Sequence, residues 1–297
     1  MTAPRVSICI PAYKAERFLG ETLDSVRAQT FADWELIVTE DGSRDGTEAI
    51  VRAFAASVSQ TVCYTRHDPN RGLPATRNAG IESARADWIA LLDSDDLWTC
   101  DHLATCWETA ARSGAELVHA GSMLFDSDTG KDLTRRAPQP EQVASLPLSL
   151  FCNRYCIQPA SVLLHRRLWE RAGRFDPAFR YVEDRDMWLR CARAGGRIAY
   201  TGLETCRYRK HGAALSTHAA PMAEATARAY DKHRDWAEIP SALRLQHCAA
   251  AWAAAGRLCW RANPAAARGH FRRACEIQWR AGWWLMGLLC AARTNSR

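Results

Sequence analysis

The stretch WIALLDSDD, residues 88–96, decides the fold that this sequence predicts. Its first five residues, 88–92, form a continuous apolar run, which is typical of a parallel strand buried on both faces. Three acids follow immediately, at Asp93, Asp95 and Asp96. Because open α/β sheets bind ligands outside the carboxyl ends of their strands, the stretch predicts such a sheet with an acidic site at its edge.

The chemistry of these acids allows two interpretations. Ligand sets made only of oxygen suit a hard divalent cation, which indicates metal-assisted chemistry on a phosphate-bearing substrate. Alternatively, the carboxylates cap a helix expected from Asp96-Leu97-Trp98 onward. An Asp-x-Asp triplet alone does not separate the two.

Strand and helix patterns alternate on both sides of this stretch, up to about residue 217. Such alternation predicts an α/β fold with a mostly parallel central sheet flanked by helices. Residues 134–142 are expected to form a polar connection that contains proline. The expected strands are 6–10, 34–38, 62–65, 88–92, 117–121, 123–125 and 161–164, and the expected helices are 18–30, 48–56, 73–84, 101–113, 167–172 and one from about 187 to 195.

The last 80 residues have a different pattern, with alanine-rich helical segments and no strand signal. They predict an all-helical appendage, with helices at roughly 221–236, 241–262, 264–279 and 283–292. Residues 205–297 carry 15 Lys and Arg against 5 Asp and Glu, whereas the rest of the chain carries 24 against 28. Tryptophans are interleaved with these arginines, as in proteins that bind a membrane surface. A helical bundle packed on the preceding domain, or a dimer contact, is the alternative.

Composition and missing motifs exclude several classes of protein. The 297 residues have the make-up of an ordinary globular protein, without a signal peptide or a span of membrane length, which predicts a cytoplasmic location. The 12 cysteines form no Cys-x-x-Cys pair, so they are expected to be reduced and mostly buried. No Gly-x-Gly-x-x-Gly follows the first strand, which excludes a dinucleotide dehydrogenase. No recognised module surrounds the basic tail, so no nucleic-acid partner is expected.

Several motifs occur in one order along the chain, and together they resemble the family 2 glycosyltransferases, inverting nucleotide-sugar enzymes with the GT-A fold. The resemblance covers about residues 4–217. The sequence departs from the family pattern at Glu40, where an Asp is usual, and at Lys14, where an Asn is usual. The motifs are Pro11-Ala12-Tyr13-Lys14, residues 40–47 (EDGSRDGT), Arg77-Asn78-x-Gly80, Asp93-Ser94-Asp95-Asp96, Phe175-Asp176, Glu183-Asp184-x-Asp186 with residues 188–190, and Tyr208-Arg209-x-His211.

The resemblance implies a domain plan and an activity. Residues 1–217 would form the catalytic domain, with a nucleotide-sugar half (1–116) and an acceptor and catalytic-base half (117–217), followed by the helical region 218–297. The implied reaction is metal-dependent and inverting. It moves a sugar from a nucleoside-diphosphate sugar, UDP- or dTDP-linked, to a hydroxyl of a saccharide or lipid-linked saccharide in envelope polysaccharide or glycolipid synthesis.

The resemblance also assigns roles to single residues. Asp184 is expected to be the general base that deprotonates the acceptor hydroxyl. Mn²⁺ or Mg²⁺ is expected on Asp95, with help from Asp93 and His211. Tyr13 would pack on the base, Asp41 would accept from a pyrimidine N–H, and Arg77 would contact the base or diphosphate. The full nucleotide-sugar set is Pro11, Ala12, Tyr13, Glu16, Asp41, Arg77, Asp93 and Ser94.

Each assignment has a simpler alternative. Asp184 could cap the helix that follows it, Tyr13 could be part of the core, and His211 could be structural. The chain as a whole could be a catalytically silent scaffold or binding module in a polysaccharide assembly. A peripheral position at the inner face of the plasma membrane, through the Trp-rich tail, is a further expectation.

Overall fold

A computed structural model of the chain describes residues 3–212 and 217–294. It divides into two compact units. The sheet unit consists of Met1–Leu150 and Arg154–His211, and the helical unit consists of Phe151–Asn153 and Gly212–Arg297. The ends of the predicted regions 1–217 and 218–297 include residues 1–2, 213–216 and 295–297, which lie outside the described residues. The assignment of these regions as catalytic and accessory stays a prediction.

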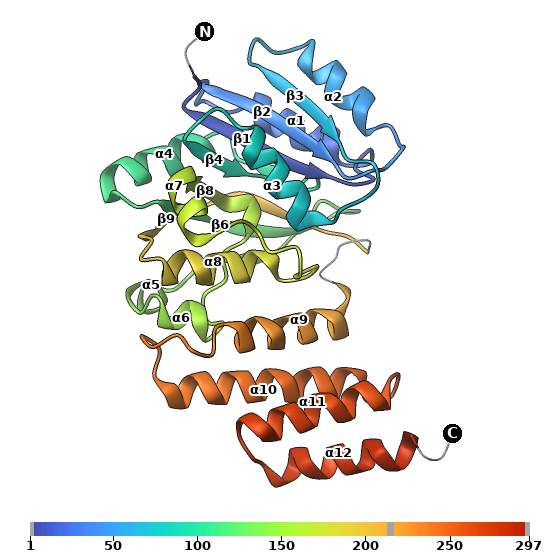
Figure 1. Cartoon of the computed structure of the whole chain (residues 1–297). Helices are drawn as coiled ribbons and strands as arrows, with labels where there is room; N and C mark the ends of the chain where they lie inside the picture. Colours follow the sequence, from blue (N-terminus) through green and yellow to red (C-terminus); the bar gives the residue numbers. More distant parts are fainter. Residues whose placement is uncertain (1–2, 213–216, 295–297) are drawn as a thin grey trace. The chain divides into compact units, whose positions relative to one another are not determined.

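The sheet unit contains a nine-stranded sheet within the described residues (Figure 1). Its order is β3-β2-β1-β4-β8-β6-β9-β5, and β7 pairs with β6. β1 to β4 are mutually parallel, and β8 is antiparallel to both β4 and β6. β6 and β9 therefore run in the direction of β4, as the mostly parallel prediction requires. The bounds are β1 Val6–Ala12, β2 Trp34–Glu40, β3 Val62–Arg66, β4 Trp88–Leu91, β5 Leu97–Trp98, β6 Leu117–Asp126, β7 Asp132–Arg136, β8 Val162–His165 and β9 Ile198–Lys210.

Burial explains why the first strands form. Every residue of β1 and of β2 is buried, since helices cover both faces of this part of the sheet (Figure 1). Ile8 of β1 lies opposite Leu36 of β2 on one side and Ala90 of β4 on the other. The helices of this unit and its junction are α1 Leu19–Arg27, α2 Thr47–Ala55, α3 Leu73–Ser83, α4 His102–Ser113, α5 Pro140–Ala144, α6 Leu148–Phe151, α7 Arg166–Ala172 and α8 Glu183–Arg193.

Two sequence predictions were wrong in the second half of the sheet, and a long strand was missed. The expected strands 117–121 and 123–125 are a single strand, β6, because its pairing with β9 continues across an irregular register near Gly121. The polar connection 134–142 begins inside β7, which pairs with β6. β9 was not predicted, although it is the longest strand among the described residues.

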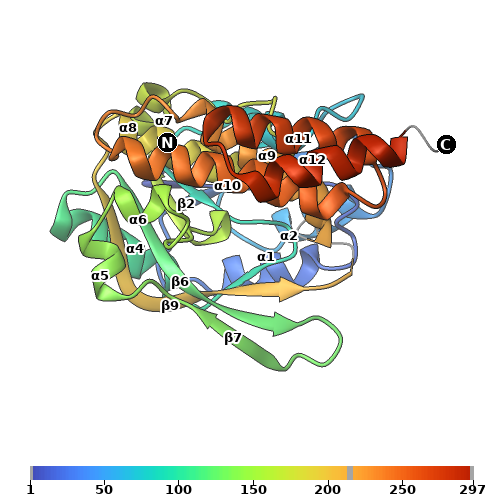
Figure 2. The same cartoon turned by 90° about the horizontal axis from the view of Figure 1, so that it is seen from below.

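The helical unit contains α9 Ala219–Lys232, α10 Ser241–Cys259, α11 Pro264–Ile277 and α12 Ala281–Thr294. Each helix packs on the next, and α10, α11 and α12 run side by side in Figure 2. Asn263 caps α11 by accepting a hydrogen bond from the Ala266 amide, which explains the predicted Asn263-Pro264 break. None of the described helices is long and apolar enough to cross a membrane.

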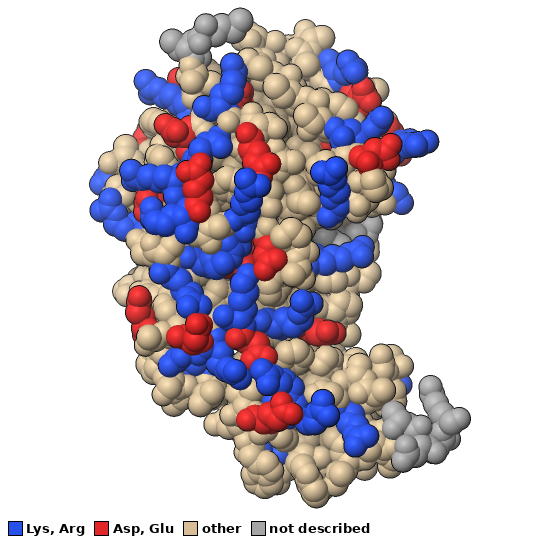
Figure 3. Space-filling view, in the orientation of Figure 1, with Lys and Arg blue, Asp and Glu red and all other residues tan. Residues whose placement is uncertain are grey.

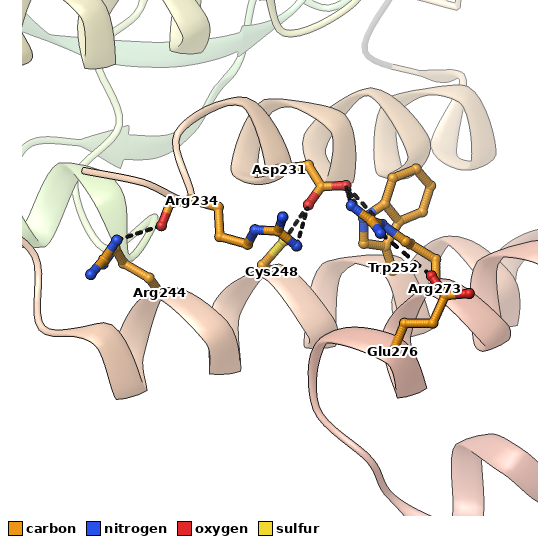
Figure 4. Close-up of polar contacts among 7 residues, drawn as sticks. All are labelled: Asp231, Arg234, Arg244, Cys248, Trp252, Arg273 and Glu276. Atoms are coloured by element: carbon orange, nitrogen blue, oxygen red, sulfur yellow. Dashed lines mark hydrogen bonds and ion pairs between the residues drawn. The ribbon is translucent and has the colours of Figure 1, made fainter. Parts of the chain in front are cut away.

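A polar cluster centred on Asp231 connects three of these helices (Figure 4). Arg273 of α11 donates to Asp231 Oδ2 through Nε and NH2, at 3.0 and 2.9 Å. Two residues of α10 also donate to this carboxylate, Trp252 through Nε1 at 3.2 Å and Cys248 through Sγ at 3.3 Å. Arg234 forms an ion pair with Oδ1 at 3.5 Å. The carboxylate is therefore surrounded by donors and positive charge.

Candidate active site

The acidic segment 93–96 is held from both sides by the backbone and side chains of other elements. Thr22 of α1 donates to the Ser94 carbonyl at 3.1 Å. Arg209 of β9 donates through Nε to the Asp95 carbonyl at 2.7 Å, and through its backbone amide to Asp96 Oδ1 at 2.8 Å. The segment leads into β5, and the next helix begins only at His102, so the helix-cap interpretation of these acids is wrong.

Asp95 and His211 converge at the end of β9. His211 Nε2 lies 2.8 Å from Asp95 Oδ2, and the ring of Phe18 packs on the imidazole with centroids 4.9 Å apart. About a third of the Asp95 side chain is exposed, whereas His211 is mostly buried. One carboxylate and one imidazole are thus in contact, and the carboxylate is partly exposed.

Arg77 is the centre of a second group of acids. Its guanidinium is 2% exposed and forms ion pairs with Asp93, at 2.7 Å, and with Glu183. The ring of Phe175 lies beside it, 5.6 Å from Cζ. Burial without these partners would be very unfavourable, so Arg77 joins the acidic segment to the N-terminus of α8. Its predicted contact with base or diphosphate stays a prediction.

Local packing fixes the position of Arg77. Asn78 exchanges two hydrogen bonds with the backbone of Phe175, at 2.8 and 2.9 Å. Gly80 lets α3 approach the sheet, because a Cβ there would come within 3.3 Å of Thr39 Oγ1 and 3.6 Å of Cys9 Cβ. The Arg-Asn-x-Gly motif therefore combines two ion pairs of Arg77, two hydrogen bonds of Asn78 and one close approach at Gly80.

Glu183 and Asp184 lie in the first turn of α8, where the helix dipole favours negative charge. Burial nevertheless raises the pKa of both carboxyls, and the positive charge of Arg77 opposes the shift. The charge of Asp93 adds to the increase at Asp184. Asp184 Oδ1 also accepts a hydrogen bond from the Arg185 amide at 2.7 Å, so the capping alternative stays open beside the base role. Asp186 is fully buried and pairs with Arg190 at 2.8 Å, which is a structural contact.

Asp41 is held in a tight loop after β2. Its carboxylate accepts hydrogen bonds from the Arg71 amide at 2.8 Å and the Gly72 amide at 2.7 Å, and contacts His67 Nδ1 at 2.9 Å. Although burial opposes ionisation, these hydrogen bonds lower the pKa of Asp41. Gly42 has φ +77°, and a Cβ there would lie 2.9 Å from the Asn70 amide nitrogen. The predicted hydrogen bond from Asp41 to a pyrimidine stays a prediction.

The remaining predicted residues lie around the end of β1. Pro11 and Ala12 are buried at its last positions. Tyr13 follows and is half-exposed, so its interpretation as plain core packing is wrong. Glu16 accepts a hydrogen bond from the Gly46 amide at 2.8 Å, a contact that fixes the loop before α2. Glu40 accepts hydrogen bonds from Ser43 and Tyr64, so its extra methylene, relative to Asp, reaches the neighbouring strand.

The donor set is compatible with a divalent cation that shares its ligands with a substrate. Within the described residues, no group of three or more His, Cys, Asp or Glu could hold a metal ion by itself. Asp95 and His211 nevertheless converge on one point, and Asp93 lies two residues away on the same segment. Ions such as Mg²⁺ use few protein ligands and complete their coordination with water and substrate phosphates. These residues fit that mode of binding.

Gln158 was missed by sequence reasoning. Its side chain is buried, yet neither Nε2 nor Oε1 has a hydrogen-bond partner among the described residues. Its neighbours on the chain are fixed by two tryptophans: Trp188 of α8 donates to the Ile157 carbonyl at 3.1 Å, and Trp98, just after the acidic segment, donates to the Ala160 carbonyl at 2.6 Å. The chain on either side of Gln158 is therefore tied to α8 and to β5. No local pattern around it signals such an unsatisfied amide.

The sequence is similar to those of known glycosyltransferases. The sequence model of glycosyl transferase family 2 matches residues 7–169. The alignments with the first two curated relatives, at 29% identity, span slightly less than three fifths of the length of each relative. One further relative is the UDP-Glc:alpha-D-GlcNAc-diphosphoundecaprenol beta-1,3-glucosyltransferase WfgD of Escherichia coli. It is 27% identical over 184 residues, which are 62% of this chain and 68% of that protein.

Solved structures resemble the fold over most of the chain. Residues 1–349 of TarS from S. aureus, in complex with UDP-GlcNAc, align with a TM-score of 0.70 at 15% identity, over 92% of this chain and 81% of that one. The mannosyltransferase PcManGT from Pyrobaculum calidifontis, in complex with GDP-Man and Mn²⁺, aligns with a TM-score of 0.64 at 17% identity. That alignment covers 98% of this chain and 85% of that one.

Proposed function

The chain belongs to glycosyl transferase family 2 and has the GT-A fold, and from that premise we propose that it transfers a sugar from a nucleoside-diphosphate sugar to an acceptor hydroxyl, with inversion. The observation that carries the proposal is the joining of two acidic groups by one buried arginine. Arg77 pairs with Asp93 at the end of β4 and with Glu183 at the start of α8. Arg77 thereby fixes the position of Asp93, in the proposed donor site, relative to Glu183, the neighbour of the candidate base Asp184.

Asp184 is the candidate for the base. An inverting transfer needs one carboxylate that takes the proton of the acceptor hydroxyl as the new bond forms on the face opposite the leaving group. Burial raises the pKa of Asp184, which makes its ionised form a stronger proton acceptor than an ordinary aspartate. Glu183, next to it, is engaged with Arg77 and is assigned to positioning.

Asp95 and His211, with Asp93, are the residues that would hold Mn²⁺ or Mg²⁺. A bound divalent cation supplies Lewis-acid stabilisation of the charge that builds on the leaving diphosphate. The fixed position of Asp95 follows from the hydrogen bond between its carbonyl and Arg209. The packing of Phe18 against His211 restricts the orientation of the imidazole.

The donor proposed is a UDP- or dTDP-sugar. Tyr13, half-exposed beside the Asp41 loop, offers an aromatic face to a base, and Asp41 is the carboxylate proposed to accept from a pyrimidine N–H. A UDP-Glc donor in the name of the Escherichia coli relative supports this choice. Gln158, whose buried amide has no hydrogen-bond partner among the described residues, is proposed to contact hydroxyls of the donor sugar.

The acceptor proposed is a hydroxyl of a saccharide or lipid-linked saccharide in envelope polysaccharide synthesis. Its support is the diphosphoundecaprenol-linked acceptor in the name of the Escherichia coli relative, and similarity to a teichuronic acid biosynthesis glycosyltransferase of Bacillus subtilis, 28% identical over 193 residues. The cytoplasmic location stays a prediction.

One panel tests the proposal. Thermal shift and sugar release are measured with UDP-, dTDP- and GDP-sugars, with and without Mn²⁺. One nucleotide sugar is expected to stabilise the protein in a metal-dependent manner. Asp95→Ala should lose this stabilisation, Asp184→Asn should keep it but release no sugar, and Asp128→Ala, an exposed carboxylate of the same unit, should behave like the unmodified chain.

The same panel separates the enzyme from a silent scaffold. Stabilisation by a nucleotide sugar without release of sugar or transfer to any acceptor would favour a binding module. Absence of stabilisation by every donor tested would contradict the proposal as a whole.

A further inference from the structure

α12 is apolar on two faces. Trp283, Met286 and Cys290 pack against a small core formed with Ala267, Phe271 and Ala274 of α11 and Ala253 of α10. Gly287 lies on the same face, where an added Cβ would be 3.7 Å from Phe271 Cβ. This face accounts for the packing of α12 onto the helical unit.

The second face is exposed. Trp284, Leu285, Leu288 and Leu289 are each between 49% and 55% exposed. Their spacing is that of neighbours on one side of a helix, so they form a continuous stripe. No charged residue occurs from Ala281 to Ala292. An apolar stripe of this kind marks an interaction surface, because isolated apolar residues, not stripes, are normal on a protein surface.

The part of the chain that carries this stripe is strongly basic. Residues 241–292 contain seven arginines and one acid, Glu276. Trp279, 67% exposed, and the exposed Arg280 stand just before α12. Lys and Arg side chains also gather on the face of the helical unit that is visible in Figure 3. The other exposed arginines of α10, α11 and the turn between them are Arg257, Arg261, Arg268 and Arg272.

We propose that this stripe lies on an anionic lipid surface, with its apolar side chains among the headgroups and the arginines on the lipid phosphates. Tryptophan beside arginine suits such an interface, because the indole has an apolar body and a polar N–H. The 14 residues of α12 extend about 21 Å, less than the roughly 30 Å of a bilayer core, so the helix lies along the surface. Charge argues against a second copy as occupant, since two such basic surfaces repel each other.

The test is co-sedimentation of the full chain with vesicles of 30 mol% phosphatidylglycerol in phosphatidylcholine, compared with pure phosphatidylcholine. The chain is expected to bind the anionic vesicles at low salt, more weakly at 0.5 M salt, and to prefer them over neutral vesicles. Leu288→Glu is expected to weaken binding about tenfold or more, since it puts a charge among the headgroups. Arg280→Gln should weaken binding less and reduce its salt dependence.

Leu203→Glu is the matched control, because Leu203 is 50% exposed and lies on β9 of the sheet unit. It should leave vesicle binding unchanged. Circular dichroism of all variants checks that the helices are intact. Absence of binding to anionic vesicles at low salt, or equal losses in Leu288→Glu and Leu203→Glu, would overturn the proposal. So would sedimentation velocity that shows a dimer abolished by Leu288→Glu without any vesicle binding, which would assign the stripe to a second copy.

Discussion

The Arg77 and Asp231 clusters both place charged side chains inside the protein, but with opposite balances of charge. Around Arg77 a single cation faces several acids, with Asp93 and Glu183 in contact and Asp184 close enough to affect its pKa. Around Asp231 a single acid faces two arginines, an indole N–H and a thiol. The first cluster has an excess of negative charge, and the second has an excess of donors.

The difference supports the proposal that the Arg77 cluster is reactive, whereas the Asp231 cluster is structural. Burial raises the pKa of Glu183 and Asp184, and the negative charge of a neighbouring carboxylate adds to the increase at each of them. Such a site is stabilised when a cation or a positively charged transition state arrives. The Asp231 cluster has no comparable excess of negative charge, and its hydrogen bonds link α9, α10 and α11. Four predictions follow from this contrast, in order of decreasing effect.

Asp184→Asn should lower the rate of sugar transfer more than any other single substitution in the Arg77 cluster. We expect sugar transfer to fall by about 10²–10⁴, the usual contribution of a general base, while donor binding measured by thermal shift is kept. In the unmodified chain, activity should also fall as the pH drops through the raised pKa of Asp184, at higher pH than for an ordinary aspartate. Loss of donor binding in this variant would contradict the base role.

Arg77→Met and Arg273→Met compare the two clusters directly. Arg77 is almost fully buried, so its removal leaves buried acids without a partner and should cost about 3–5 kcal/mol in the free energy of unfolding. Arg273 is 38% exposed and Asp231 keeps other donors, so its loss should cost about 1 kcal/mol. Urea unfolding of both variants measures the difference. Equal costs would remove the distinction between the clusters.

Gln158→Leu tests whether the buried, unsatisfied amide of Gln158 binds a ligand. Replacing a buried amide that has no partner should stabilise the fold by about 1–3 kcal/mol. If the amide binds the donor sugar, kcat/KM should fall about tenfold at the same time. Gln139→Leu, at an exposed helix cap, serves as a control without an effect on kcat/KM. Higher stability with unchanged kcat/KM would show that Gln158 has no role in binding.

Asp41→Asn should have the smallest effect, a change in how the free energy of unfolding depends on pH. The folded state lowers the pKa of Asp41, so its carboxylate contributes stability above the unfolded pKa of about 3.9, and this contribution is lost as the pH falls through the folded value. The variant should lose about 1–3 kcal/mol near pH 7 and clearly less near pH 3, where the carboxylate of the unmodified chain begins to be protonated. Thermal unfolding between pH 3 and 7 measures it. A difference that does not change with pH would contradict the assignment.

Local pattern was sufficient for the first half of the sheet. The apolar runs of β1, β2 and β4 predict buried parallel strands, because burial on both faces leaves no polar position in the run. β9 carries polar or charged residues along much of its length and is half-exposed over much of it, so it has no comparable run. It is a strand because β6 and β5 pair with it.

The sequence by itself determined the family motifs, the positions of the first strands along the chain and the acidic segment that follows β4, since these depend on neighbouring residues. Tertiary structure alone decided that Arg77 meets Glu183, 106 positions away, that Gln158 has a buried amide without partners, and that one face of α12 is exposed. The physical reason is that ion pairing and burial depend on which distant atoms fill the space around a side chain, and periodicity along the chain contains no such information.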